Sequence, residues 1–231
     1  MTEPSQPSAA SPITVVIADD QPIICAGFAA LLDAQPDMQV CGTAANGNDL
    51  IRLVHQYQPD VAVVDIRMPV LDGISATREL VATGVATKVL ILTTFDLDDY
   101  VYDALRSGAS GFLLKDVTAD RMVDAVRLVA DGSMLLGPSV TRRLVQDVAQ
   151  ARPVSDTTRA ENLVALLTRR EHEIFDLLAR GLPNAEIAGE LVLSTETVKS
   201  HVAEVLRKLE LRDRVQVVVF AYENGLVHPG A

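Results

Sequence analysis

The sequence predicts two domains of different fold class: a doubly wound α/β domain with a five-stranded parallel sheet, then a small all-α domain of four helices. In residues 13–131, short β-branched runs alternate with longer stretches at helical spacing. Near-continuous apolar strands are typical of parallel sheets covered on both faces. From residue 163 onward the strand-like run Val217–Val219 lies between Asp213 and Gly225. These residues favour a helix start and a helix end, so the run is assigned to a helix.

The segments outside these two domains have little apolar periodicity. Residues 1–12 are rich in Pro, Ser and Ala, without a basic residue or an apolar core, which excludes a signal peptide and predicts a disordered N-terminal arm. Residues 132–162 are predicted to be a linker with one short helix, at residues 139–149. The domains are therefore expected at residues 13–131 and 163–231.

Composition excludes several classes of protein. No apolar run approaches the roughly 18 residues that span a bilayer, so no membrane partner is expected. The two cysteines, Cys25 and Cys41, lie in apolar stretches and match no metal-ligand spacing. They are predicted to be reduced, buried core thiols of a cytoplasmic protein.

Polar residues end several of the predicted strands. Asp19 and Asp20 close the first strand and Asp65 the third, while Thr93 and Lys115 end the fourth and fifth. Ligands of doubly wound sheets bind outside the carboxyl ends of the strands. Three carboxylates at adjacent strand ends repel each other unless they share a cation, and their hard oxygens suit Mg²⁺. A carboxylate beside such an ion can accept a phosphoryl group. Any one of these residues could be an ordinary loop residue, but the set predicts a site.

A helix predicted from Thr195 to Leu209 has Ser194 as a favourable N-cap. Apolar residues recur along it at i, i+4, i+7, i+8 and i+11, which places them on one face that is expected to pack in a core. They are Val198, Val202, Val205, Leu206 and Leu209.

The other face of this helix is polar and begins with small side chains. Helices that enter the major groove use their N-terminal residues on bases, and free N–H groups at a helix start favour phosphate contact. Lys199 and Ser200 are predicted to contact base edges, and Thr195, Thr197 and Arg207 the DNA backbone. Considered alone, this could be one more amphipathic helix in a bundle.

The charge distribution limits how DNA could be bound. The net charge is −11, with 12 basic and 21 acidic side chains in residues 1–162 and 8 and 10 in residues 163–231. Since neither part is basic, nonspecific DNA affinity should be weak and strongly reduced by salt. Binding would then depend on a few well-placed cations and on the pairing of two subunits.

The strand-end residues belong to motifs that resemble a known family. The matching pieces are Asp19-Asp20, Asp65-Ile-Arg-Met-Pro with Asp72-Gly73, Leu92-Thr93, and Gly108-Ala-Ser-Gly-Phe-Leu-Leu-Lys115. In these, residues 13–131 resemble the flavodoxin-like receiver domain of bacterial response regulators.

This resemblance implies a role for each site residue. Asp65 would be the phosphoacceptor, and Lys115 a second positive partner for the phosphoryl group. Thr93 and Phe112 would form the switch pair. Mg²⁺ would be bound by Asp20, Asp65 and the backbone carbonyl of Arg67, and less directly by Asp19.

The second domain also resembles a known family. Its motifs are Leu167-Thr-x-Arg-Glu, Gly181-x-x-Asn-x-Glu-Ile-Ala, Leu193-Ser-x-x-Thr-Val-Lys-x-His, and Lys208-Leu with Arg214. They resemble the LuxR-type helix-turn-helix, and the whole chain resembles response regulators of the NarL/FixJ class. The resemblance implies a transcription regulator, not an enzyme, with a sensor histidine kinase and double-stranded DNA as partners. It also implies a homodimer, at least when phosphorylated or on DNA, formed through the final helix.

Two alternatives remain open. A phosphotransfer hydrolase with an aspartyl nucleophile generally needs a second Asp two residues later, where this chain has Arg67. An interaction module whose receiver is never phosphorylated would keep the fold without the chemistry. A further hypothesis concerns Arg67 and Phe95, which are bulky and flank the expected path of a hydrolytic water. They would make the phosphorylated state comparatively long-lived.

Overall fold

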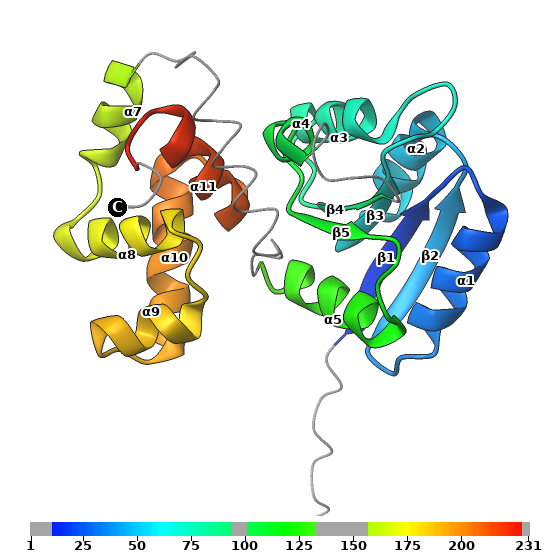
Figure 1. The fold of residues 1–231 in the computed structure, drawn as a ribbon, viewed down its shortest axis with the longest axis horizontal. Helices are drawn as coiled ribbons and strands as arrows, with labels where there is room; N and C mark the ends of the chain where they lie inside the picture. The colour runs from blue at the N-terminus through cyan, green and yellow to red at the C-terminus, as the bar shows by residue number, and fades with distance from the viewer. Residues whose placement is uncertain (1–10, 94–100, 133–156, 228–231) are drawn as a thin grey trace, which may run out of the picture.

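The computed structural model describes residues 11–93, 101–132 and 157–227 (Figure 1). The first domain has a five-stranded sheet in the order β2-β1-β3-β4-β5, with all neighbouring strands parallel. Its strands are β1 (Ile13–Ala18), β2 (Met38–Ala44), β3 (Val61–Asp65), β4 (Lys88–Thr93) and β5 (Gly111–Leu114). Its helices are α1 (Pro22–Asp33), α2 (Gly47–Tyr57), α3 (Gly73–Ala82), α4 (Val101–Arg106) and α5 (Ala119–Ala130). The predicted doubly wound α/β fold is confirmed.

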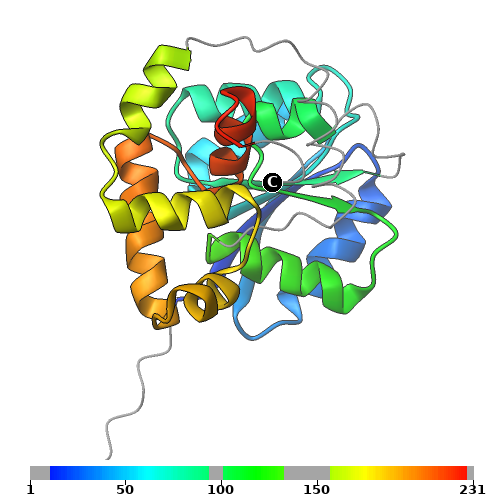
Figure 2. The same ribbon diagram turned by 60° about the vertical axis from the view of Figure 1, so that its left-hand side comes forward.

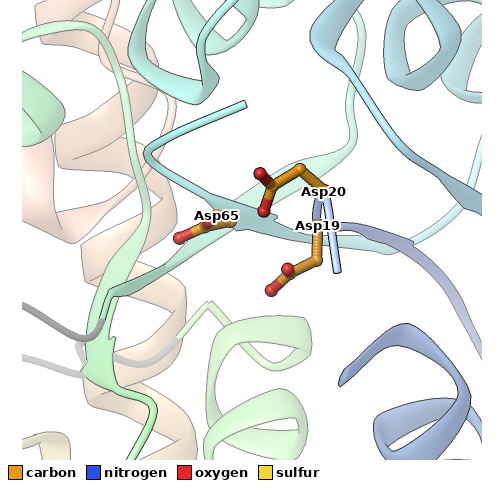
Figure 3. A group of neighbouring side chains, drawn as sticks. All are labelled: Asp19, Asp20 and Asp65. Atoms are coloured by element: carbon orange, nitrogen blue, oxygen red, sulfur yellow. The ribbon is translucent and has the colours of Figure 1, made fainter. Parts of the chain in front are cut away.

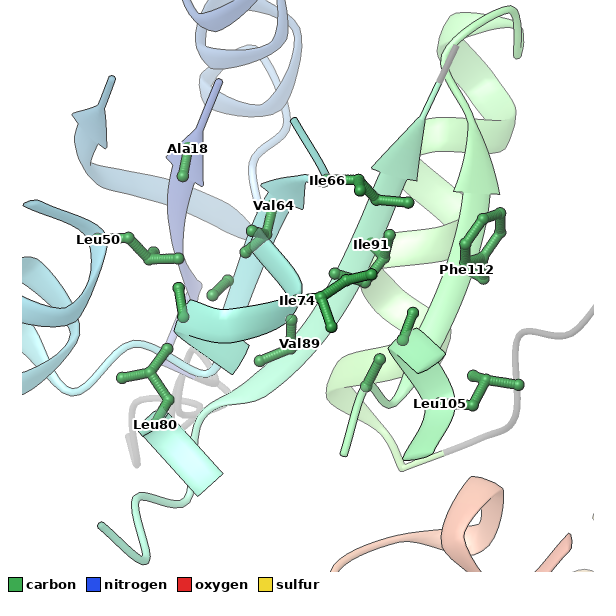
Figure 4. Close-up of a cluster of buried hydrophobic side chains, with 14 of the residues drawn as sticks. Ala18, Leu50, Val64, Ile66, Ile74, Leu80, Val89, Ile91, Leu105 and Phe112 are labelled. Carbon is green, nitrogen blue, oxygen red and sulfur yellow. The ribbon is translucent and has the colours of Figure 1, made fainter. Parts of the chain in front are cut away.

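Alternate residues of the central strands feed two separate cores. Val15 and Ile17 of β1 point to the face covered by α1 and α5, while Val16 and Ala18 point to the face covered by α2, α3 and α4. This follows from the two-residue period of a strand. Figure 4 shows the second face. Burial on both sides explains why these strands are continuous apolar runs.

All regular secondary structure in the described residues of the second domain is helical. It comprises α7 (Thr157–Val164), α8 (Arg169–Ala179), α9 (Asn184–Leu191), α10 (Thr195–Leu209) and α11 (Arg214–Glu223). Thr168 and Glu171 form a reciprocal capping box at the start of α8, which satisfies two backbone N–H groups that a helix end leaves unpaired. The Val217–Val219 run is helical as predicted, with Asp213 as the N-cap of α11.

The predicted end of the linker is wrong. The helix α7 begins at Thr157, inside the segment 132–162 that the sequence assigned to a linker. Ala160 and Val164 lie one turn apart and are 2% and 8% exposed, so a short apolar stripe packs into the core of the second domain. The polar residues around them conceal this stripe in the sequence. The helix predicted at residues 139–149 and the residue Phe95 lie outside the described residues.

The two cysteines differ from each other. Cys25 is buried as expected, whereas Cys41 is only half-buried, and both are free thiols.

Within the described part of the chain, none of the helices combines the length and apolar character needed to cross a bilayer.

Candidate functional site

Three carboxylates meet at the carboxyl edge of the sheet. Asp19 and Asp20 follow β1, and Asp65 ends the neighbouring strand β3, where Ala18 pairs with Val64. One oxygen from each carboxylate lies within 4.8 Å of the others (Figure 3). Asp19 and Asp65 are buried, while Asp20 is exposed. The sequence predicted this grouping from the strand ends alone.

Lys115 supplies a positive charge to the carboxylates. It follows β5, and its backbone N–H donates to the Thr93 carbonyl at 2.8 Å. Its Nζ lies 2.5 Å from Asp19 Oδ2 and 3.1 Å from Asp65 Oδ2, with the side chain only 7% exposed. Lys115 therefore bridges the two buried carboxylates.

The site carries more negative than positive charge, so a cation could bind there. Burial raises the pKa of Asp65, although the charge of Lys115 opposes this. Burial alone would lower the pKa of Lys115, but the hydrogen bond to Asp19 and the charge of Asp65 outweigh it and raise the pKa. One ammonium group faces three carboxylates, which a hard divalent cation with oxygen ligands would balance. The residues present thus fit Mg²⁺.

The loop after β3 holds Asp65 in place. The backbone N–H of Gly73 donates to the Ile66 carbonyl at 2.8 Å, and Asp72 caps α3 by accepting from the Ser75 N–H at 2.8 Å. A hollow beside the acidic cluster is lined by Asp20, Arg67, Met68, Asp72, Ser75 and Asp103. Sequence reasoning missed Asp103, because it lies on α4 and no motif links it to the strand ends.

Thr93 and Phe112 lie on adjacent strands. Phe112 pairs in register with Ile91, two residues before Thr93, so the period of a strand puts Thr93 on the same face as Ile91 and Phe112. Phe112 is 3% exposed and Thr93 is 4% exposed. Figure 4 shows Ile91 beside Phe112. A movement of the Thr93 side chain would therefore change the packing of the core that contains Phe112.

The helix α10 presents the residues predicted to contact DNA. Ser194 caps it by accepting from the Thr197 N–H at 3.1 Å. The predicted core face is buried, except that Leu206 is half-buried against the core. Thr195, Lys199, Ser200 and Arg207 are exposed and Thr197 is half-buried.

Four of these side chains have partners within the chain. Thr197 Oγ1 lies 2.8 Å from Ser194 Oγ. Lys199 Nζ lies 3.2 Å from Asp131 Oδ1 of the first domain. Arg207 forms an ion pair with Glu204. Ser200 Oγ donates to the Glu196 carbonyl at 3.0 Å, which a DNA base would have to replace.

Two further motif residues hold the helical domain together. Lys208 Nζ lies 2.7 Å from Glu171 and joins α10 to α8. Arg214 is 3% exposed and donates to the Leu182 carbonyl and, at 3.4 Å, to Asn184 Oδ1. Burial lowers the pKa of Arg214 to about 10. Lys208 and Arg214 therefore stabilise the packing of the helical domain.

Comparison with known proteins assigns both domains. Residues 15–127 match the family model of the response regulator receiver domain, and residues 165–221 match that of the bacterial regulatory proteins of the luxR family. The chain is 40% identical over 215 residues to the uncharacterized transcriptional regulatory protein YxjL of Bacillus subtilis (strain 168), covering 93% of this chain and 97% of that protein.

Two further relatives agree over almost the whole length. The oxygen regulatory protein NreC of Staphylococcus carnosus (strain TM300) is 36% identical over 214 residues, covering 92% of this chain and 98% of that one. The crystal structure of response regulator ChrA of a heme-sensing two-component system superimposes with a TM-score of 0.51 at 34% identity, covering 94% and 100% of the two chains. The chain belongs to the response regulators of two-component systems, transcription regulators in which a receiver domain precedes a LuxR-family DNA-binding domain.

Proposed function

We propose that phosphorylation of Asp65 controls DNA binding by this protein. The observation that supports it most is the acidic cluster: the carboxylates of Asp19, Asp20 and Asp65 lie within 4.8 Å of one another, and Lys115 reaches two of them. A carboxylate in such a setting can take a phosphoryl group whose oxygens are neutralised by neighbouring cations.

Each residue has a distinct part in this proposal. A carboxylate oxygen of Asp65 forms the bond to phosphorus as the bond to the donor nitrogen of a histidine kinase breaks. Lys115 then pairs with a phosphoryl oxygen. Asp20, Asp65 and the Arg67 carbonyl would hold Mg²⁺, with Asp19 acting less directly. When bound, Mg²⁺ would neutralise charge on the incoming phosphoryl oxygens.

The structural change caused by phosphorylation of Asp65 would reach the core through Thr93 and Phe112. Thr93 ends β4 one strand away from Asp65, so its hydroxyl can move toward a phosphoryl oxygen. Phe112 shares the apolar core with α4, so a change at this ring would reach the surface. Phosphorylation can shift only an equilibrium between states that it stabilises unequally.

In the output domain, Lys199 and Ser200 would contact base edges, and Thr195, Thr197 and Arg207 the backbone of double-stranded DNA. We expect a homodimer, at least when phosphorylated or on DNA, because residues 163–231 carry 8 basic and 10 acidic side chains and so give a single subunit little nonspecific attraction to DNA. The free thiols Cys25 and Cys41 are in keeping with a cytoplasmic location.

Intact mass spectrometry tests the chemistry directly. The full chain is incubated with Mg²⁺ and acetyl phosphate, alongside Asp65→Asn and, as a matched control, Asp116→Asn, an exposed carboxylate beyond β5. Wild type and Asp116→Asn should each gain the mass of one phosphoryl group, and Asp65→Asn none. A gain in Asp65→Asn equal to that of wild type would place the phosphoacceptor elsewhere. No gain in any chain would favour the interaction module that is never phosphorylated.

A further inference from the structure

The hollow beside the acidic cluster lies between two helices of the receiver. The start of α3 and the loop before it supply most of its lining residues, and α4 supplies Asp103. In both ribbon views α3 and α4 lie side by side (Figures 1 and 2). The hollow has a volume of about 600 Å³, within the range of roughly 300–1,000 Å³ that is usual for ligand pockets. It is therefore large enough to receive a group from outside the chain.

The lining of the hollow is partly apolar and partly charged. Ile66, Met68 and Ile74 line it and are at most 9% exposed. Asp20 and Asp103 line it too, and both are exposed. A hollow with a buried apolar floor and a charged rim fits a group that has an apolar stem and a charged head.

The charge along the rim is mainly negative. The carboxylates that line the hollow are Asp20, Asp72 and Asp103, and Arg67 is the only cation that lines it within the described part of the chain. Asp72 caps α3, where its two carboxylate oxygens accept from the N–H and the hydroxyl of Ser75, each at 2.8 Å. Asp20 is assigned to Mg²⁺ in the proposed function. Asp103 has neither role, so it is the carboxylate best suited to bind a further cation.

A protein that phosphorylates Asp65 has to cover this hollow. Phosphoryl transfer requires the reacting atoms to approach to about 3–3.5 Å, and a protein interface covers roughly 800 Å² of each partner. Asp20 belongs both to the hollow and to the cluster whose oxygens lie within 4.8 Å of one another, so the hollow borders the phosphoacceptor. If nothing filled it, its carboxylates would lose contact with water without gaining a partner, which is unfavourable.

We propose that the hollow receives a lysine or arginine side chain of the protein that donates the phosphoryl group, with the cationic head on Asp103 and the stem on the apolar floor. Long basic side chains bury their stems on apolar surface while the head stays with polar groups. The hollow thereby selects among protein donors, whereas acetyl phosphate carries no cationic group to place there. This inference rests on the proposed function, because it names the partner's chemistry for the phosphorylation of Asp65.

The full chain and two phosphodonors give a matched test. The protein donor is the autophosphorylated histidine kinase, from the organism that encodes this chain, that phosphorylates wild type fastest; the small donor is acetyl phosphate. Asp103→Asn removes the charge in the hollow. Asp124→Asn removes the same charge from α5, on the other face of the sheet, where the side chain is 69% exposed. Intact mass gives the initial rate of phosphorylation with each donor.

Asp103→Asn should lower the ratio of the kinase rate to the acetyl phosphate rate at least about tenfold, because one partner of an interface charge pair is lost. Asp124→Asn should keep the ratio of wild type. An unchanged ratio in Asp103→Asn would overturn the proposal. An equal fall in both variants would also overturn it, since the effect would then be one of overall charge.

Two results with wild type separate this inference from the proposed function. Labelling by acetyl phosphate alone, with no kinase active on the chain, would overturn the inference by removing its partner and would leave the chemistry of Asp65 standing. No labelling by either donor would overturn the proposed function, and this inference with it.

An exchange of charges identifies the occupant. Asp103→Lys places an ammonium group in the hollow, so the kinase rate should fall further than in Asp103→Asn. The kinase is then varied by replacing single lysines and arginines near its phosphohistidine with glutamate. One of these kinase variants should phosphorylate Asp103→Lys faster than wild type. If every one of them phosphorylates wild type faster, no basic side chain of the donor meets Asp103 and the proposal is wrong.

Discussion

Gly73 packs so closely on Asp65 that a Cβ added to Gly73 would overlap the Asp65 carbonyl oxygen. The neighbouring hydrogen bond from the Gly73 N–H to the Ile66 carbonyl keeps this approach in place. The start of α3 is thereby fixed against the end of β3, and with it the position of the carboxylate that we propose is phosphorylated. A glycine is needed here for space and not for an unusual φ.

Gly73→Ala should lower the free energy of unfolding by about 3 kcal/mol, at the upper end for overpacking, because backbone atoms must move apart. Displacing the end of β3 should also slow phosphoryl uptake at Asp65. Gly27→Ala in α1 is the control, since a Cβ there meets nothing within 4 Å and alanine favours a helix interior by up to about 1 kcal/mol. Urea unfolding and intact mass measure the two effects; equal stability of the two variants would contradict the steric argument.

Lys115→Gln should destabilise the metal-free chain by about 3 kcal/mol, because Asp19 and Asp65 would remain buried without their shared cation. Mg²⁺ should then stabilise the variant more than wild type, since it would supply the missing positive charge. Urea unfolding with and without Mg²⁺ measures both. Lys199→Gln, an exposed lysine, should change stability by less than about 0.5 kcal/mol. The same gain from Mg²⁺ in wild type and Lys115→Gln would be inconsistent with a shared site.

Arg67 borders the hollow beside the acidic cluster, and its side chain is exposed. If it obstructs the approach of water, Arg67→Ala should dephosphorylate several-fold faster than wild type. The loss of phosphoryl mass over time, after removal of the phosphodonor, gives the rate. Arg52→Ala, on the exposed face of α2, is the control. An unchanged rate in Arg67→Ala would show that the side chain does not lie in the path of water.

Lys199 is the predicted base-contacting residue that also pairs with the receiver. Lys199→Ala should weaken DNA binding by about 1–3 kcal/mol, the usual cost of losing a base contact. Asp131→Ala should instead strengthen binding modestly, because it frees the Lys199 ammonium from its partner. Fluorescence anisotropy with promoter DNA, at several salt concentrations, checks both. A loss of affinity in Asp131→Ala would show that the ion pair supports the DNA-binding conformation.

The contact between the domains, in which Ser110 Oγ donates to Asp213 Oδ2 at 2.6 Å, should depend on pH through Asp213. Burial raises the pKa of this carboxyl, although its hydrogen bond with Ser110, its backbone N–H donors and Arg212 oppose the shift. The ammonium of Lys88 also interacts electrostatically with Asp213. A raised pKa means that the folded, closed chain binds the proton more tightly, so its stability is greatest below the ordinary carboxyl pKa and declines as pH rises through the raised value.

Wild type should therefore gain stability over Asp213→Asn when the pH falls from about 7 to about 4, near the ordinary carboxyl pKa. The asparagine keeps an oxygen that can cap α11 but has no proton to gain. Urea unfolding of both chains at the two pH values measures the difference. A difference that is the same at both values would mean that Asp213 keeps one protonation state throughout.

Much of the receiver fold could be predicted from local patterns in the sequence. The strands are visible as apolar runs because both faces of the sheet are covered, and Asp19, Asp65, Thr93 and Lys115 are visible because they interrupt those runs where each strand ends. Parallel strands bring their carboxyl ends to one edge, so order along the chain is enough to predict the cluster. The alternation of Val15 with Val16 likewise predicts two cores from the period of a strand.

Other features could not be found in this way. The helix α7 was missed because Ala160 and Val164 form a stripe of a single turn among polar residues. The run Val217–Val219 was visible, but its partners were not: Val217 and Val218 are identical neighbours, yet one packs in the helical domain and the other in the receiver.

The sequence by itself therefore determined the secondary structure around the acidic site and the chemistry of that site, because both depend on residues near one another in the chain or at fixed ends of strands. Only the tertiary structure decided that the receiver covers Val218 of α11 and that Ser110 binds Asp213, 103 residues later. Apolar burial has no direction, so a valine-rich face shows that a partner is needed, whereas the partner is selected by the shape and the hydrogen-bonding groups of the surface that meets it.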